Sequence, residues 1–535
     1  MIKCHMCRSS NLYKFLDLGS QPHSDGFLTK EDLSNPEPFY PLDVYICRDC
    51  GLVQLGTIVS GRVMYNEKYF YEQSTTDTGK CHYFSMSKMV CERFALPKSS
   101  LVVDIGSNVG VLLSGFKAQG MSILGVDPAP LIAKKANELG IETIADFFNP
   151  EVARKIVGMK GKAKVVTGTN IFAHLPDLHE TMDSLKILLD EDGMFIIEVP
   201  YLVDLIKNVE YDTIYHQHLR YISVKPLVPF FAGHGFEIFD IEKLPIHGGS
   251  LRISVSRKGK RKISPHAQEF LDLEKKENIY SLEVLQDFAK KVAEQRRLLM
   301  ELLLKLKAEG KRIVAVSTPA KGNTLLNYCG IGADILDYAT EKAKIKIGLY
   351  TPGTHIPIFP DARLLEDMPD YALLLAWNFA EEIMRNNQEY LKRGGKFIIP
   401  IPKPRVVTEM EEMKIENRSP AASDKRGTII DIMSGEIHHV SIITFTKGSV
   451  RANHYHKNQT QYTYVIRGEI ELKMKDLREK NPKVTTTVMP ERSFVAIPPM
   501  VIHKLTALKD SEILALTTEE RTSEKYEEDT YRIEI

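Results

Sequence analysis

The sequence predicts an α/β multidomain protein with a small metal-binding module before the α/β part and an all-β barrel after it. Two CxxC pairs, Cys4/Cys7 and Cys47/Cys50, lie in a Pro- and Gly-punctuated start, and such pairs are typical of metal-binding modules. From Leu101 to about residue 404, apolar strands alternate with helical stretches, as in doubly wound parallel sheets. Short alternating strands follow, as in antiparallel barrels.

Length and charge narrow the class of protein. A chain of 535 residues is too long for one hydrophobic core. Lysine plus arginine equals aspartate plus glutamate, at 70 each, so no net field would attract nucleic acid or an anionic membrane. No signal-like start, bilayer-length apolar run or secreted disulfide pattern is evident. We expect a cytoplasmic protein that binds small molecules, with no nucleic-acid or membrane partner.

The chain is predicted to divide into four domains: 1–75, 76–255, 256–404 and 405–535. The second contains the strands LVVDIG, SILGVD, KVVTGT and MFIIEVP. In the third, a helix from Ser281 to Glu309 precedes the strands RIVAVS, DYALLLA and KFIIPI. A polar linker from Thr408 to Asp424 leads to HHVSIITF, QYTYVI and EIELKM, which alternate as half-buried strands do.

The cysteine pairs predict one structural zinc site. Thiolates two residues apart at a tight turn bind one tetrahedral ion, and two such turns complete four ligands without an open position. The alternative is a set of scattered buried thiols. Two complete pairs in one small module favour zinc bound by Cys4, Cys7, Cys47 and Cys50.

A glycine-rich turn predicts a nucleotide-like ligand. VVDIGSNVG ends a strand at Asp104 and opens a helix through Gly106, Asn108 and Gly110, where glycines let a ligand approach the backbone. Asp127 closes the next strand at a distance suited to ribose hydroxyls. Such turns bind NAD, FAD or S-adenosylmethionine, or only pack, and the departure from GxGxxG favours the methyltransferase pattern. Further predicted cofactor contacts are Asp146, Phe147, Asn170 and His174.

The strip IYHQH, Ile214 to His218, carries two histidines beside a tyrosine. Three interpretations stand: a metal site, a proton-transfer site, or a hydrogen-bonded part of the core. Metal binding is weakly supported because no carboxylate or cysteine in the strip completes a ligand set.

Several strings in one order resemble the sugar C-methyltransferases that act on nucleotide-linked 4-keto-deoxyhexoses. They are the cysteine module, VDIGSNVG, EVPY, DTIYHQH, HGGSLR, PAKGNTLLNYCGI, PGTHIPI and LAWNFAEEI, and they run from residue 1 to 404. The resemblance implies a zinc module, an S-adenosylmethionine-dependent methyltransferase domain and a C-terminal Rossmann-like domain around a sugar nucleotide.

The resemblance also implies roles for the strip. Carbon methylation requires a carbanion-like nucleophile, so a base must remove a proton beside the ketone and a donor must stabilise the enolate oxygen. His218 suits the base and Tyr215 the donor, and Gln217 replaces the family's glutamate. Tyr71 aligns with a tyrosine-rich segment near the sugar. Predicted substrate contacts, each with a purely structural alternative, are His247, Gly248, Gly249, Ser250, Arg252, Lys321 and His355.

The segment Gly448 to Gly468 resembles the first cupin motif, and PPMVIH resembles the second. Strand alternation would direct His454 and His456 to one interior, where His503 joins them, with Gln461 at the motif's glutamate position. Three imidazoles and an amide would hold a second divalent metal, or paired histidines would transfer protons. We expect a cupin that isomerises a keto sugar nucleotide, as a 3,4-ketoisomerase, or epimerises one. The alternative is a cupin that only binds sugar or forms a homodimer.

The whole chain is therefore predicted to be a bifunctional enzyme. Residues 1–404 would transfer methyl from S-adenosylmethionine to C3 of a dTDP-4-keto-deoxysugar, and the cupin would act on a related sugar. One alternative is a methyltransferase acting on another carbon or an oxygen, with an unrelated cupin. The other is an inactive sugar-nucleotide-binding protein, suggested by the amides Gln217 and Gln461.

Overall fold

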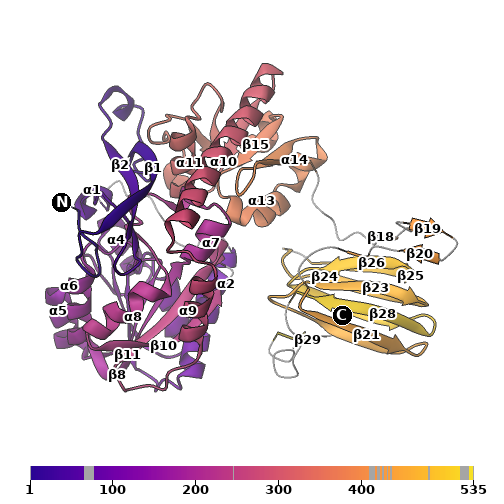
Figure 1. Ribbon diagram of the computed structural model, residues 1–535, viewed down its shortest axis with the longest axis horizontal. Helices are drawn as coiled ribbons and strands as arrows, with labels where there is room; N and C mark the ends of the chain where they lie inside the picture. The colour runs from indigo at the N-terminus through magenta and orange to yellow at the C-terminus, as the bar shows by residue number, and fades with distance from the viewer. Residues whose placement is uncertain are drawn as a thin grey trace. The chain divides into compact units, whose positions relative to one another are not determined.

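The computed structural model in Figure 1 contains two compact units, Met1–Met410 and Glu411–Ile535. It describes residues 2–65, 77–244, 246–408, 416–417, 422–424, 427–429, 432–433, 437–479, 482–518 and 529–533. Two predicted site groups, Tyr71 and the side chain of His247, lie outside the described residues. None of the helices in these ranges is both long and apolar enough to cross a bilayer.

The N-terminal module is built on a four-stranded antiparallel sheet in the order β1-β2-β3-β9. Its strands are β1 (Leu12–Pro22), β2 (Phe39–Cys47), β3 (Val53–Leu55) and β9 (Arg220–Tyr221). Leu16, Leu18, Val44 and Ile46 are buried on it. Strand β9 follows the histidine strip, so the strip is tied to the module's sheet. The short helix α1 (Gly61–Met64) follows β3, and α2 (Asp77–Arg93) leads out of the module.

The second domain contains a seven-stranded sheet in the order β10-β11-β8-β7-β4-β5-β6. Five strands are parallel, whereas β11 runs antiparallel to β8 and β10 antiparallel to β11. The expected parallel sheet is thus extended into a mixed one. The strands are β4 (Leu101–Ile105), β5 (Ser122–Val126), β6 (Thr143–Ile144), β7 (Ala163–Thr169), β8 (Leu189–Pro200), β10 (Phe236–Leu244) and β11 (Ser250–Arg257).

Strand β4 lies between β5 and β7, so the strand order reverses there. In open α/β sheets, ligands bind outside the carboxyl ends of the strands at such a reversal. The helices of the domain are α3 (Val111–Ala118), α4 (Pro130–Glu138), α5 (Pro150–Lys160), α6 (Leu178–Leu188), α7 (Leu202–Lys207) and α8 (Val224–Gly233).

Local sequence signals explain where several helices begin. Asn149 and Asp177 precede α5 and α6, and each side chain accepts two backbone N–H groups of the first turn. Ser281 precedes α10 (Leu282–Ala308), and its side chain accepts one backbone N–H, that of Val284. Gly310, in the left-handed conformation at φ 73°, follows its end. The long helix predicted from Ser281 to Glu309 is confirmed.

The third domain has a six-stranded sheet in the order β14-β13-β12-β15-β16-β17, parallel except for β17. The strands are β12 (Ile313–Val316), β13 (Ala339–Glu341), β14 (Ile358–Pro360), β15 (Tyr371–Leu374), β16 (Lys396–Ile399) and β17 (Arg405–Val407). Besides α10, the helices are α9 (His266–Lys276), α11 (Ala320–Cys329), α12 (Arg363–Asp367), α13 (Ala380–Asn386) and α14 (Gln388–Lys392). This is the expected second α/β domain.

In its described residues, the second unit contains strands only, in two five-stranded sheets ordered β18-β26-β23-β28-β21 and β25-β24-β27-β22-β29 and in the hairpin β19-β20. The apolar side chains Val465, Leu472, Val495 and Leu505 are buried in its core. The strands are β18 (Glu416–Asn417), β19 (Ala422–Asp424), β20 (Gly427–Ile429), β21 (His439–Phe445), β22 (Val450–Tyr455), β23 (Gln461–Arg467), β24 (Glu469–Asp476), β25 (Val484–Pro490), β26 (Ser493–Ile497), β27 (Val501–Ala507), β28 (Ser511–Thr517) and β29 (Tyr531–Arg532).

Candidate active site

The four paired cysteines meet at one point. Cys4 Sγ lies 3.5 Å from Cys50 Sγ, Cys7 Sγ lies 3.5 Å from Cys47 Sγ, and all four sulfurs are within 4.8 Å of one another. A tetrahedral zinc ion with Zn–S bonds of about 2.3 Å would separate its sulfurs by about 3.8 Å. The cluster therefore fits one zinc ion and leaves no ligand position for water.

The glycine-rich turn follows β4 at the reversal of strand order. A Cβ atom at Gly106 would lie 2.7 Å from Ile171, and one at Gly110 would lie 2.6 Å from Ile141. Both residues have positive φ, at 68° and 80°. The conformation and packing of the turn therefore require glycine at both positions, whether or not a ligand approaches the backbone.

Two carboxylates lie beside this turn. Asp104 is buried and accepts the hydroxyl of Thr167 at 2.6 Å, and burial raises the pKa of Asp104 to about 7. Asp127 accepts the backbone N–H groups of Asn108 and Ala129, each at 2.9 Å. Burial also raises the pKa of Asp127. The turn therefore positions one carboxylate at the end of each of two neighbouring strands.

The other predicted cofactor contacts spread around the same sheet edge. Asp146 is exposed and accepts the N–H of Phe147 at 2.8 Å. The Phe147 ring packs edge-on against Tyr65, with centroids 6.3 Å apart. Asn170 follows β7 with φ 56°, and its N–H donates to the Glu198 carbonyl.

The geometry of the strip distinguishes its two histidines. His218 Nδ1 lies 2.7 Å from the Thr213 carbonyl oxygen, and Nε2 lies 2.8 Å from the Tyr215 hydroxyl. Because a carbonyl only accepts, Nδ1 carries the proton of the neutral ring and Nε2 has a lone pair. Both Tyr215 and His218 are half-buried. The strip thus presents a proton-accepting nitrogen beside a phenol.

His174 lies next to this pair. Its ring centroid is 4.8 Å from that of His218, and its Nδ1 is 3.2 Å from the Tyr65 hydroxyl. Burial, followed by the charges of His218 and Arg220, holds the pKa of His174 well below 6.5. His174 is thus a neutral neighbour of His218. Asp146, predicted to contact the same cofactor, is instead exposed.

His216 faces away from His218. Its Nε2 lies 3.2 Å from the Tyr40 carbonyl, and burial lowers its pKa to about 4. Gln217 is 2% exposed and contacts the N-terminal module: its amide nitrogen donates to Asp25 Oδ2 at 2.8 Å, and its amide oxygen accepts the Ser24 hydroxyl at 3.1 Å. The structure therefore separates His216 from the predicted catalytic pair.

The predicted substrate loop HGGSLR leads into strand β11, which pairs with β10 on one side and β8 on the other. A Cβ atom at Gly248 would lie 2.5 Å from Glu210, and one at Gly249 would lie 2.3 Å from Asp204. Both positions therefore require glycine, with φ values of 87° and 125°. The Ser250 hydroxyl donates to a backbone carbonyl at 3.0 Å.

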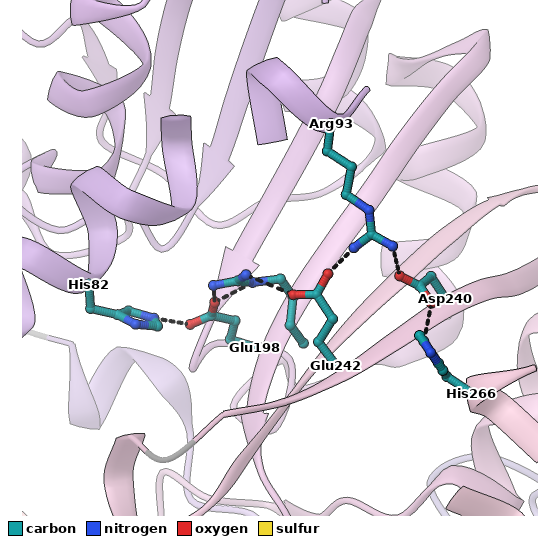
Figure 2. A network of polar contacts seen from close by, with 7 residues as sticks. His82, Arg93, Glu198, Asp240, Glu242 and His266 are labelled. Carbon is teal, nitrogen blue, oxygen red and sulfur yellow. Dashed lines mark hydrogen bonds and ion pairs between the residues drawn. The ribbon is translucent and has the colours of Figure 1, made fainter. Parts of the chain in front are cut away.

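Arg252 contacts Glu198 and Glu242, which Figure 2 shows in a network of polar contacts. Its guanidinium contacts Glu198 at 2.6 Å and Glu242 at 3.0 Å. His82 Nε2 reaches the other oxygen of Glu198 at 2.7 Å. The network continues through contacts of Arg93 with Glu242 and Asp240, and ends at His266. The Arg252 charge is thus neutralised within the domain by buried Glu198 and partly exposed Glu242.

The two predicted contacts from the third domain lie in different surroundings. Lys321 Nζ lies 3.7 Å from Asp212 and 3.9 Å from the centre of the Trp377 ring. His355 is exposed, and its Nε2 lies 3.1 Å from Glu37 of the N-terminal module. Lys321 is therefore joined to the segment that precedes the strip, whereas His355 is joined to the module.

In the second unit, His454, His456 and His503 converge. Their nitrogens lie within 4.8 Å of one another, with 3.1 Å between His454 Nε2 and His456 Nε2. His503 Nδ1 donates to the Val501 carbonyl, and burial lowers the pKa of His503 to about 4. Gln461 is buried, and its amide donates to Thr463 at 3.3 Å.

Most of the first 402 residues match known protein families. Residues 4–65 match a family described as zinc binding, 85–241 a methyltransferase domain, and 245–402 the C-methyltransferase C-terminal domain. Over 409 residues the chain is 36% identical to the C-methyltransferase NovU of Streptomyces niveus, covering 76% of this chain and 97% of NovU. The chain belongs to the C-methyltransferase family.

As a C-methyltransferase, the protein uses S-adenosylmethionine, and its cysteine cluster lies in the zinc-binding region. Residues 422–531 match the polysaccharide biosynthesis C-terminal domain. Two solved structures also show similarity. The dTDP-4-dehydrorhamnose 3,5-epimerase from Sulfolobus tokodaii is 23% identical with a TM-score of 0.19, covering 21% of this chain and 78% of that one. QdtA, a sugar 3,4-ketoisomerase from Thermoanaerobacterium thermosaccharolyticum, is 20% identical with a TM-score of 0.20, covering 23% and 90%.

Sequence reasoning missed residues that surround the strip in this C-methyltransferase. Asp25 contacts Gln217, Tyr65 contacts His174, and Asp212 accepts the Trp377 indole at 2.6 Å. None of the three belongs to a sequence motif whose residue spacing indicates a catalytic or binding site. For Asp212, the only available signal was its place three residues before Tyr215 in DTIYHQH.

Proposed function

We propose that this C-methyltransferase methylates C3 of a nucleotide-linked 4-keto-deoxysugar, with a dTDP carrier, through an enolate. The strings shared with sugar C-methyltransferases across residues 1–404 support the substrate class. The single observation that carries the mechanism is the tautomer of His218, whose Nδ1–H donates to the Thr213 carbonyl. That bond leaves Nε2 free of a proton in the neutral ring, as a base requires.

Proton removal is assigned to His218 and enolate stabilisation to Tyr215. A proton taken from the carbon beside the ketone moves to Nε2, and the resulting imidazolium remains bonded to the Thr213 carbonyl through Nδ1. The Tyr215 hydroxyl, now 2.8 Å from Nε2, can turn its hydrogen toward the enolate oxygen. His174 stays neutral beside the ring, since burial lowers its pKa, so it adds no opposing charge.

The cofactor is assigned to the carboxyl ends of β4, β5 and β7. The Asp127 carboxylate accepts two backbone N–H groups and has further lone pairs, with which it would accept the ribose hydroxyls. The turn from Asp104 to Gly110 would contact the remainder of the cofactor. Phe147 would contact the adenine. S-adenosylmethionine supplies an electrophilic methyl group when bound. The carbon nucleophile that receives it is formed by His218.

Mass spectrometry and NMR test this assignment. Incubation with S-adenosylmethionine and a panel of dTDP-4-keto-deoxysugars should yield a product one methyl group heavier. The methyl resonance should be that of a methyl on carbon, because the enolate carbon is the nucleophile. A methyl resonance typical of an O-methyl group would contradict the proposed reaction.

The second unit carries a separate proposal: proton transfer on a keto sugar nucleotide by His454 and His456. Their Nε2 atoms approach to 3.1 Å in the interior of the domain, so one ring can deliver a proton while the other removes one. His503 and Gln461 would complete a divalent metal site with them if the domain binds metal. Two metal ions per chain in the intact protein, one of them in the cysteine cluster, would indicate a metal site in the second unit, and one ion per chain would indicate proton transfer without metal. Domain limits at 75, 255 and 404 and a homodimer through the cupin remain predictions.

A further inference from the structure

Gln217 places a neutral amide in the strip, at the position where the resemblance to sugar C-methyltransferases implies a glutamate. Gln217 can orient a hydroxyl group but cannot carry the negative charge that a glutamate would supply. Its side chain does not point to solvent, being 2% exposed. It is instead bonded to an acid of the N-terminal module, which lies 192 positions earlier in the chain.

Asp25 is that acid, and only one of its oxygens is used among the described residues. Oδ2 accepts the Gln217 amide at 2.8 Å, whereas Oδ1 is buried without a hydrogen-bond partner in the described part of the chain. Asp25 is 6% exposed. A buried carboxylate oxygen without a donor is costly, so it indicates a position where a ligand supplies the donor.

Among the described residues, no ion pair with Asp25 is found. The Asp25 N–H donates to His23 Nδ1 at 2.9 Å, so that nitrogen is unprotonated. Burial lowers the pKa of His23, which keeps the ring neutral. Asp25 also acts on Tyr65, whose pKa is raised first by burial and then by the Asp25 charge. Tyr65 in turn contacts His174 beside His218, which places Asp25 in the surroundings of the catalytic pair.

The loop that carries Asp25 is fixed from two sides. Ser24 donates its hydroxyl to Gln217, and its carbonyl accepts the buried Asn323 amide of α11 at 2.6 Å. Leu28 exchanges backbone hydrogen bonds with Tyr350. Because the loop is bonded both to Gln217 of the strip and to Asn323 and Tyr350 of the third domain, the carboxylate is held in one position relative to the strip.

We propose that Asp25 and Gln217 form a one-charge carboxyl–amide pair in which Asp25 supplies the carboxylate of the methyl-transfer site and accepts a hydrogen bond from a substrate hydroxyl group. The inference rests on the proposed function for the identity of that substrate. It also explains the amide: a glutamate at position 217 would lie against Asp25, and two carboxylates at this distance cannot both ionise.

An exchange of the two functional groups tests the pair. Asp25→Asn should lower kcat/KM for the sugar nucleotide by about 10- to 100-fold, mainly through KM, while S-adenosylmethionine affinity stays within two-fold. The double variant Asp25→Asn/Gln217→Glu returns one carboxylate to the site and should recover to within about five-fold of wild type. Glu31→Gln, which removes an exposed carboxylate from the same module, is the matched control and should be unchanged.

Thermal unfolding of the unliganded protein gives a readout that needs no substrate. Gln217→Glu alone should lower Tm at pH 8 and much less at pH 5, because the paired carboxylates share a proton at low pH. The double variant should remove that pH dependence. The proposal is overturned if the double variant is no more active than Asp25→Asn, or if it keeps the pH-dependent loss of Tm. If the wild type methylates no sugar nucleotide, the proposed function fails, whereas the unfolding data still decide whether the pair holds one charge.

Discussion

His218 is held by two neighbours with different chemical roles, the Thr213 carbonyl and the Tyr215 hydroxyl. Replacing it by alanine removes the nitrogen assigned to proton abstraction, while the residues proposed to bind the cofactor lie at the carboxyl ends of β4, β5 and β7. His218→Ala should bind S-adenosylmethionine normally by calorimetry and lose on the order of 10² to 10⁴ in kcat. Solvent deuterium exchange into the substrate should fall with it.

Tyr215→Phe provides the comparison for this variant, because it keeps the ring and removes only the hydroxyl. It should retain deuterium exchange better than His218→Ala does, since the base is intact. Near-normal turnover of His218→Ala would assign the base to another residue of the site, and the proposed mechanism would be wrong.

Asp104 predicts a pH dependence of stability. Its pKa is raised to about 7 by burial, above the unfolded value of about 3.9. A carboxyl group whose pKa is raised on folding costs stability as pH increases from about 4 to 7. Asp104→Asn, which keeps an acceptor for Thr167, should therefore gain roughly 2 to 3 kcal/mol relative to wild type between pH 5 and 8. Urea unfolding of the unliganded proteins measures the difference in free energy of unfolding between variant and wild type at pH 5 and at pH 8. The same difference at both pH values would contradict the prediction.

The strip shows where residue-level prediction from sequence ends. The chemistry of a base and a donor indicated His218 and Tyr215, but spacing alone did not indicate that His216 faces Tyr40. Nor did any local pattern indicate Asp25, because its contact with Gln217 joins segments far apart in the chain. Such contacts depend on packing between domains, which periodicity does not contain.

At the scale of elements, the cysteine cluster joins the two turns that flank β1 and β2. Because four thiolates leave no ligand position for water, the metal should stabilise the module without taking part in catalysis. Cys47→Ser should lower Tm and soluble yield, while the kcat of the surviving folded enzyme changes by less than about three-fold. Mass spectrometry of the purified variant measures whether zinc is lost. A metal-free wild type that is as stable as the zinc-bound protein would contradict the structural role.

Elements with strong local signals were predictable. Helix α10 was confirmed because Ser281 and Gly310 mark its ends, and the apolar runs at β4, β5, β7 and β8 were recognisable as buried strands. Strand β9 has only two residues, too few for any periodicity. The antiparallel strands β10 and β11 extend the predicted parallel sheet, and their pairing depends on the rest of the sheet.

At the scale of the whole molecule, the chain contains two compact units with separate clusters of chemical groups. Replacing His454 and His456 by alanine should abolish any isomerase or epimerase activity, because both rings are needed for metal binding or proton transfer. Methyl transfer should stay within a few-fold of wild type, since the two sites lie in different units. Parallel assays of the intact double variant measure both activities, and a loss of methyl transfer with the fold retained would contradict independent sites.

The pairing of β9 with β3 has a consequence for synthesis on the ribosome. The module's first three strands are complete at Leu55, but the strand that covers β3 is not made until Arg220 and Tyr221, roughly 165 residues later. At about 5 to 20 residues per second, this takes on the order of ten to thirty seconds. During that time the nascent chain exposes β3 as an open edge, the kind of surface on which other strands can add. Translation speed across residues 56–221 should therefore influence how much newly made enzyme escapes aggregation.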